Sequence, residues 1–273
     1  MRKKPITLFV LLALGCGVTA MAQWGRGRYR MFPKFPSAHP IHRDFTFSRV
    51  WYQSDRREPG GQGWHTDYPI ADRNLMIRLS ELTTTHVGFD EREEPDHVVL
   101  RLSDTTLFNY PFIFMSDVGT LWLSEFEASR LREYLLKGGF LWVDDFWGPS
   151  AWDQWVGEIR KALPPGQYPI VDIPIDHPIH QGMFDIVRVP QIPSIQHWRR
   201  SGGSTTSERG HSSADVHFRG IADAEGRVMV LMSHNTDIAD GWEREGEDYE
   251  FFYRFSIDAY ALGINVVVHA MTH

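Results

Sequence analysis

The sequence predicts an α/β fold with a mainly parallel, open sheet of the flavodoxin-like kind and helices on both faces. Short apolar segments alternate with longer ones in which apolar residues recur every three or four positions. Two of the short segments, 111–115 and 140–143, are apolar throughout, as expected for strands buried on both faces. Strands that alternate with helices in this order require right-handed crossovers, which place helices on both faces of a parallel sheet.

Each strand is predicted from a short apolar segment that ends near a turn signal. The segments 217–222 and 227–233 are separated by Asp223-Ala224-Glu225-Gly226, which predicts a hairpin near the C-terminus. The other predicted strands are 45–52, 97–102, 111–115, 140–143 and 170–173.

The helices are predicted from apolar spacing and from their end signals. Ala71, Leu75, Leu79 and Leu82 share one helical face, and Pro69 stands near the first turn. A second helix is expected to begin at a capping box of Ser124 and Glu127 and to end at Gly138 as a left-handed cap; a third runs from Ser150 toward Pro164. Segment 176–180 is expected to be a short turn and 190–215 an irregular loop. The tail, including 263–271, is expected to be helical, with a strand at Val266-Val267-Val268 as the alternative.

The N-terminal residues predict export. Arg2, Lys3 and Lys4 precede a short apolar stretch, and Ala20-Met21-Ala22 has the form of a cleavage site, so residues 1–22 are interpreted as a signal peptide. A lipoprotein signal with Cys16 as the modified residue is the alternative, although the residues before it fit that pattern poorly. Residues 23–43 are basic and rich in Gly and Pro, which indicates an extended arm; residues 44–273 are expected to form a single domain.

Composition excludes several classes of protein. Hydrophobic residues make up 42% of the chain, which indicates a packed domain, and the net charge of −7 argues against a nucleic-acid partner. Beyond the signal, no stretch is expected to span a membrane. The one cysteine, Cys16, lies within the signal, so the mature chain is expected to lack disulfides and thiolate chemistry.

Polar clusters follow several of the predicted strands. Open α/β sheets bind ligands beyond the carboxyl ends of their strands, so these clusters are expected to converge on one crevice. Arg209 is included because the Ser/Gly-rich loop 201–210 could form an anion nest, although a mobile surface loop is the favoured interpretation. The candidate ligand-binding residues are Asp67, Tyr68, Asp117, Asp144, Asp145, Trp147, Arg209, His234, Asn235, Asp237 and Trp242.

Structural roles compete with these functional ones. Asp67 or Asp72 could cap a helix, and Asp144 and Asp145 would point to opposite faces of a strand, so that at most one faces a ligand. Zinc sites need three or four ligands of defined spacing, so His234 among acids is weak evidence for metal. The acidic run from Glu243 to Asp248 is typical of a solvated surface, with calcium as the alternative. No nucleophile elbow, P-loop or zinc-protease motif is present.

Several longer motifs resemble one bacterial family. They are Trp64-His65-Thr66-Asp67-Tyr68-Pro69, 138–148 from Gly138-Gly139 through Asp144-Asp145-Phe146-Trp147-Gly148, 206–210, Ser233-His234-Asn235-Thr236-Asp237 and Gly241-Trp242-Glu243. Over 45–273 the chain resembles the DUF4159 family, a domain of unknown function that is often exported or membrane-tethered. That family is similar in layout to class I glutamine amidotransferases and ThuA-like proteins. The resemblance implies an amidotransferase-like fold in which Asp144-Asp145-Phe146 replaces the catalytic cysteine turn, which excludes glutaminase chemistry by the covalent route.

Three functional hypotheses remain. The leading one is a non-catalytic ligand-binding or scaffolding domain of the cell envelope, with Trp147 and Trp242 stacking on a sugar, peptide or protein segment, and no cofactor. The second is a hydrolase acting on a carbohydrate or envelope substrate. It would use Asp144 or Asp145 with Asp237 and His234 as general base, and a divalent metal could assist. In the third, the basic arm docks the domain on a membrane complex.

Overall fold

The computed structural model describes residues 32–36, 44–90 and 93–273. The expected signal peptide and most of the expected arm lie outside the described residues. Residues 34–273 form one compact unit.

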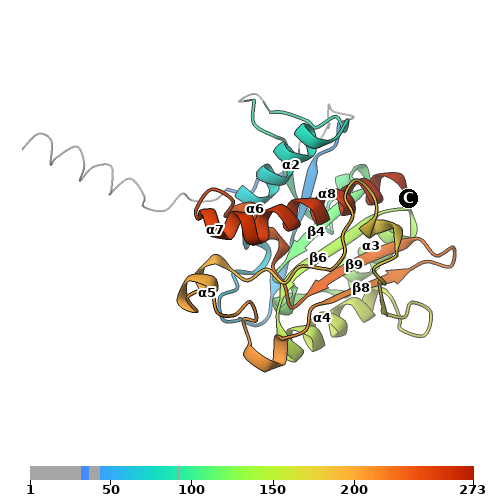
Figure 1. The fold of residues 1–273 in the computed structure, drawn as a ribbon. Helices are drawn as coiled ribbons and strands as arrows, with labels where there is room; N and C mark the ends of the chain where they lie inside the picture. Colours follow the sequence, from blue (N-terminus) through green and yellow to red (C-terminus); the bar gives the residue numbers. More distant parts are fainter. Residues whose placement is uncertain (1–31, 37–43, 91–92) are drawn as a thin grey trace, which may run out of the picture. The chain divides into compact units, whose positions relative to one another are not determined.

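The main sheet has seven strands and is mostly parallel, which confirms the predicted α/β fold class (Figure 1). Strands β3, β1, β4, β6 and β9 lie side by side in that order and are all parallel, whereas β8 and β7 add an antiparallel edge beyond β9. The parallel strands follow the order 2-1-3-4-5 along the chain, which is the flavodoxin-like order with a switch point beside the first strand. The bounds are β1 Phe47–Trp51, β3 His97–Arg101, β4 Phe112–Ser116, β6 Phe140–Phe146, β7 Val171–Asp172, β8 His217–Ala222 and β9 Val228–His234.

Helices cover both faces of this sheet because alternate strand residues point to opposite sides. Phe112 and Phe114 of β4 join the core beneath helices α2, α6 and α8, whereas Ile113 and Met115 join the core beneath α3 and α4. The bounds are α2 Ile70–Leu82, α3 Glu125–Leu136, α4 Gly148–Ala162, α5 Ile195–Arg200, α6 Ile238–Glu243, α7 Tyr249–Phe251 and α8 Ile257–Thr272.

The expected end signals of α3 are present. The Ser124 hydroxyl accepts a hydrogen bond from the Glu127 backbone N–H at 3.2 Å, and the Glu127 carboxylate accepts one from the Ser124 N–H at 3.0 Å. Gly138 follows the helix with φ of 103°, a left-handed conformation that glycine adopts without strain. The capping box and the glycine therefore fix the length of α3 and deliver the chain into β6.

The remaining elements are short. Segment 190–215, which was expected to be irregular, contains α5 and one 3-10 turn, and the expected strand at 170–173 is reduced to the two residues of β7. Strands β2 (Gln53–Ser54) and β5 (Leu121–Trp122) form a separate antiparallel pair. Single turns of 3-10 helix occur at η1 Gly63–His65, η2 Thr105–Asn109, η3 Val118–Thr120, η4 Pro178–His180 and η5 Gly210–Ser213, and η6 Phe252–Ser256 is a π-helical turn.

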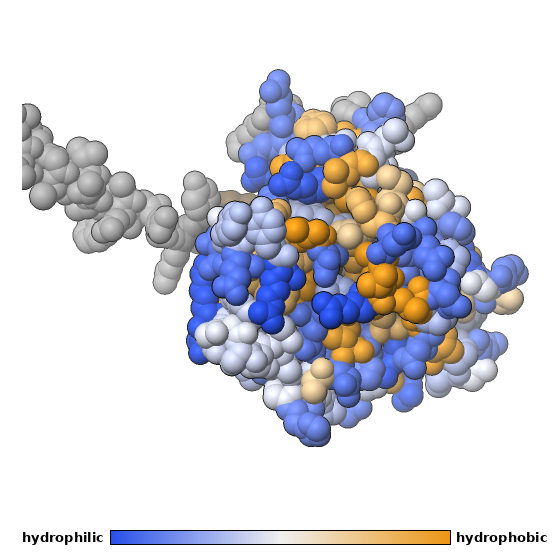
Figure 2. Space-filling view, in the orientation of Figure 1, coloured by the Kyte–Doolittle hydropathy of each residue, from blue (hydrophilic) through white to orange (hydrophobic). Residues whose placement is uncertain are grey.

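The C-terminal helical segment is helical as expected, and it is more apolar than expected. By length and composition alone, Tyr249–Thr272 could cross a membrane, which differs from the expectation that no stretch after the signal could do so. In the structure, 61% of its most apolar 18-residue window is buried, because α8 packs against α2, α6 and the sheet. Figure 2 shows apolar side chains among polar ones on the face that includes α8. Core burial is therefore a sufficient explanation for the composition of this helix.

Candidate functional site: an acidic pocket at the carboxyl edge of the sheet

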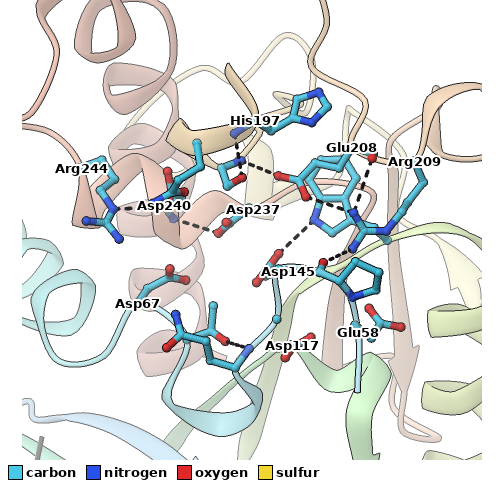
Figure 3. Close-up of a pocket in the computed structure, with 18 of the residues that line it drawn as sticks. Glu58, Asp67, Asp117, Asp145, His197, Glu208, Arg209, Asp237, Asp240 and Arg244 are labelled. Carbon is cyan, nitrogen blue, oxygen red and sulfur yellow. Dashed lines mark hydrogen bonds and ion pairs between the residues drawn. The ribbon is translucent and has the colours of Figure 1, made fainter. Parts of the chain in front are cut away.

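A pocket of about 540 Å³ lies at the carboxyl ends of the parallel strands (Figure 3). Its walls come from the segments that follow β1, β4, β6 and β9, together with the loop 194–209. This is the edge at which open α/β sheets bind ligands. Seven acidic residues line the pocket against three arginines. The acids are Glu58, Asp67, Asp117, Asp145, Glu208, Asp237 and Asp240, and the arginines are Arg200, Arg209 and Arg244.

Four residues around the pocket adopt a left-handed backbone conformation. Asp67, Asp117, Asp145 and Asn235 have φ of 64°, 54°, 54° and 63°. Asp and Asn tolerate this region better than other non-glycine residues, and such strain is concentrated at functional sites. The bends end β4 and β9 and interrupt the pairing of β6 with β9. They turn the chain out of the sheet at the level of the pocket.

A buried arginine holds the loop that carries Asp67. Arg49 in β1 is fully buried, and its guanidinium binds the Asp72 carboxylate of α2 at 2.5 and 3.1 Å. The same guanidinium donates to the backbone oxygens of Trp64 and Thr66 at 3.2 and 2.8 Å. Asp72, which the sequence analysis gave as a possible helix cap, is therefore the partner of Arg49 and fixes the 64–67 loop beside the pocket.

Asp117 holds the glycine-rich loop against the pocket. Its Oδ2 accepts a hydrogen bond from the Gly63 N–H at 2.6 Å. A Cβ atom at Gly61 would overlap the Asp117 carboxylate, so a glycine is needed for the loop to approach this closely.

The two adjacent acids of β6 have different surroundings, as the alternation of strand residues predicts. Asp144 is fully buried, and its carboxylate accepts hydrogen bonds from the Ser233 hydroxyl at 2.5 Å and from the Ala239 N–H at 3.0 Å. These bonds tie the start of α6 to β6 and β9. Asp145 lines the pocket, and its Oδ1 accepts a hydrogen bond from the Trp147 indole N–H at 2.9 Å.

Three of the pocket carboxylates form a tight group. One oxygen from each of Asp67, Asp237 and Asp240 lies within 4.8 Å of the other two. Asp237 accepts a hydrogen bond from the Asp240 N–H at 2.9 Å, and Asp240 accepts one from the Ile195 N–H at 2.8 Å. Figure 3 shows the Asp67 and Asp237 carboxylates turned toward the same space from different elements. We refer to these three residues as the aspartate triad.

Burial raises the pKa of most of these acids because it removes water from the charged form. Burial and neighbouring carboxylates raise the pKa of Asp117 to about 7, and burial raises that of Asp67 to about 6 although the Arg49 charge opposes the shift. The same two causes hold the pKa of Asp145, Asp237 and Asp240 well above the usual range of an aspartate. The pocket thus holds more carboxyl groups than its arginines can neutralise, and it favours protons or cations.

The comparison with known families finds one match, which covers nearly all of the described domain. A family model described as a domain of unknown function, DUF4159, matches residues 46–271. The chain belongs to the DUF4159 family. No curated protein matches it.

Six of the eleven residues predicted from sequence line the pocket of this DUF4159 domain. They are Asp67, Asp117, Asp145, Trp147, Arg209 and Asp237. The other five are absent from its lining, and each has a structural partner or a core position that explains its place.

Tyr68, Asp144 and Asn235 hold the backbone near the pocket. The Tyr68 hydroxyl accepts a hydrogen bond from the Lys34 N–H at 3.1 Å, and Asp144 makes the bonds to Ser233 and Ala239 given above. The Asn235 side chain accepts from the Gly148 N–H and donates to the Asp215 carbonyl, both at 2.7 Å. These three residues of the DUF4159 domain therefore connect segments that are distant in the sequence.

The expected roles of His234 and Trp242 need correction. His234 is packed among the rings of Phe146, Trp152 and His217, and burial lowers its pKa to about 4. Trp242 is fully buried, with its ring 5.5 Å from that of Trp142, so its face is not available for stacking on a ligand. Trp147 does line the pocket but is only 4% exposed, which leaves little of its side chain for contact with a ligand.

Other lining residues of the DUF4159 domain were not selected from the sequence. Asp240 stands three residues after Asp237, so helical spacing could have placed both on one side of α6. Glu58, Gln196, His197, Arg200, Glu208 and Arg244 come from loops and short helices whose approach to the sheet no local pattern indicates.

Proposed function

We propose that this DUF4159 chain is an exported, non-catalytic binding domain of the cell envelope, and that the acidic pocket takes a small hydroxyl-rich ligand of the carbohydrate class. The observation that carries the proposal is the set of buried carboxylates around one pocket at the carboxyl edge of the sheet. Every carboxyl group offers at least one oxygen that accepts hydrogen bonds, so a matching ligand must bring several donors, as the hydroxyl groups of a sugar do.

The dimensions favour a small molecule over a long protein segment. The volume of about 540 Å³ falls within the range of small-molecule pockets, about 300–1,000 Å³. The five pocket aspartates are each no more than 9% exposed, so a ligand must enter the pocket to reach them. The expectation of export is based on the N-terminal signal pattern alone.

Thermal unfolding of the full-length chain with a panel of monosaccharides and amino sugars tests this function. A sugar at about one hundred times its dissociation constant adds about 2.7 kcal/mol to the free energy of unfolding, which raises the melting temperature. Asp145→Asn keeps the acceptor for Trp147 but removes the charge, and we expect it to weaken sugar binding about tenfold. Asp153→Asn, an exposed acid on α4, is the matched control. If no sugar shifts the transition, or if both variants bind equally, the proposal fails.

One observation favours a hydrolase as the second candidate. Asp117 has a pKa of about 7 and lies in the same pocket as the other carboxylates, so it could act as a general acid near neutral pH. His234 has no part in this version because it does not line the pocket. Release of nitrophenol from aryl glycosides, lost in Asp117→Asn, would support it; the absence of turnover by the unaltered chain would exclude it for those substrates.

A further inference from the structure

The aspartate triad combines residues from two distant parts of the chain. Asp67 comes from the loop before α2, whereas Asp237 and Asp240 come from the start of α6. Backbone N–H groups hold Asp237 and Asp240 in place, as described above. The carboxylates are therefore pre-positioned, and their close approach does not depend on flexible side chains at the surface.

Asp67 supplies a second and independent observation. It is 7% exposed, and its Oδ2 is buried without a hydrogen-bond donor among the described residues. The carboxyl group of Glu243 lies near it, and two carboxyl groups bond to each other only when one of them holds a proton. An ionised Asp67 oxygen facing the pocket would cost considerable free energy unless a cation contacts it.

The nearby Arg244 and Arg49 are bound to other carboxylates and do not supply the missing cation. The Arg244 Nε lies 3.6 Å from Asp240 but 2.7 Å from Glu243, and the same guanidinium also binds Glu247 at 2.7 Å. Arg49 is occupied by the fully buried Asp72. The triad consequently holds more carboxyl groups than these two arginines neutralise.

We propose that Asp67, Asp237 and Asp240 form a binding site for one divalent cation of the oxygen-preferring class, which comprises calcium, magnesium and manganese. The donor set contains only carboxylate oxygens, the ligands that these hard cations select. Two oxygens on opposite sides of an ion are about 4.2 Å apart for magnesium and about 4.6–5.2 Å apart for calcium. The 4.8 Å limit of the triad accommodates either ion with small adjustments. In the pocket the bound ion would also contact hydroxyl groups of a ligand. This contact with a ligand rests on the proposed function, whereas the binding of the cation itself does not.

Isothermal titration of the full-length chain, after treatment with a chelator, tests the site with calcium, magnesium and manganese chloride in separate experiments. We expect one ion per chain and a dissociation constant of about 1 mM or lower for at least one of them. Asp67→Asn keeps a residue type that tolerates the left-handed backbone, removes one charge and should weaken binding at least about tenfold. Asp117→Asn, from the same pocket and with a similar φ, is the matched control and should weaken it by less than about threefold.

The outcomes separate the site from a general attraction to acids. Equal losses in Asp67→Asn and Asp117→Asn, or no binding of any of the three ions at about 10 mM, would overturn the site. If Asp67→Asn does not fold, Asp237→Asn replaces it, because its amide oxygen can still accept the Asp240 N–H. Ion binding without sugar binding would refute the proposed function alone. Sugar binding that persists with chelator, together with no ion binding, would refute the cation site alone.

Discussion

Breaking the buried ion pair between Arg49 and Asp72 should strongly destabilise the domain. Both side chains have 0% exposure, and the shortest N–O distance between them is 2.5 Å. Asp72→Asn keeps the volume of the side chain but leaves the guanidinium without a counter-charge in the core. Removing one partner of a buried pair costs about 3–5 kcal/mol, because the remaining charge stays desolvated.

Urea unfolding at neutral pH measures this cost, and an exposed pair on the same helix provides the control. Glu81 of α2 lies 2.7 Å from Arg78, with side-chain exposures of 51% and 35%. Glu81→Gln should therefore change the free energy of unfolding by less than about 1 kcal/mol, since water screens exposed pairs.

The same substitution, Asp72→Asn, should also affect the pocket. Arg49 holds the Trp64 and Thr66 carbonyls, and with them the loop that carries Asp67. Asp72→Asn should weaken cation binding although Asp72 does not line the pocket. A loss of stability below about 1 kcal/mol, equal to that of Glu81→Gln, would refute the view that this pair fixes the loop.

Three further predictions concern stability. Without divalent cations, the free energy of unfolding should fall as the pH rises from about 6.5 to about 8.5. Asp117 (pKa about 7) and Glu243 (pKa about 8) bind protons more tightly in the folded state, so the stabilisation that these protons give is lost as the two groups ionise. Urea midpoints that rise over this pH range would contradict the prediction. Asp144→Ala should cost about 2–3 kcal/mol, because the Ala239 N–H loses its acceptor and the Ser233 hydroxyl keeps only the longer bond to the Val143 carbonyl at 3.2 Å. Thermal unfolding checks this, and a cost near zero would contradict it. Ser124→Ala removes the capping box of α3 and should cost about 1 kcal/mol in the same assay without altering cation affinity; a change in that affinity would mean that the pocket depends on α3.

Much of the fold could be predicted from the sequence because local signals and tertiary structure agree. The apolar segment at 140–143 is a strand buried on both faces, and the capping box at Ser124 starts a helix as its pattern predicts. The carboxyl ends of parallel strands share one edge, so the placement of Asp117, Asp145 and Asp237 followed from strand direction alone.

The features that the sequence did not predict depend on contacts between segments that are distant in the sequence. Trp242 lies on α6, which α2 and α8 cover, and no local pattern indicates that its indole belongs to the core. The Arg209 guanidinium reaches the Pro59 carbonyl at 2.7 Å across 150 residues of sequence, and so closes one wall of the pocket. Arg49 resembled any other polar residue of a half-buried strand, although it is fully buried beside Asp72.

The most direct test of the cation site is a crystal structure of the full-length chain grown with manganese, with anomalous scattering used to locate the ion. We expect one anomalous peak between Asp67, Asp237 and Asp240, about 2.0–2.6 Å from an oxygen of each. Carboxylates that diverge from one another, or a peak only elsewhere on the molecule, would contradict it.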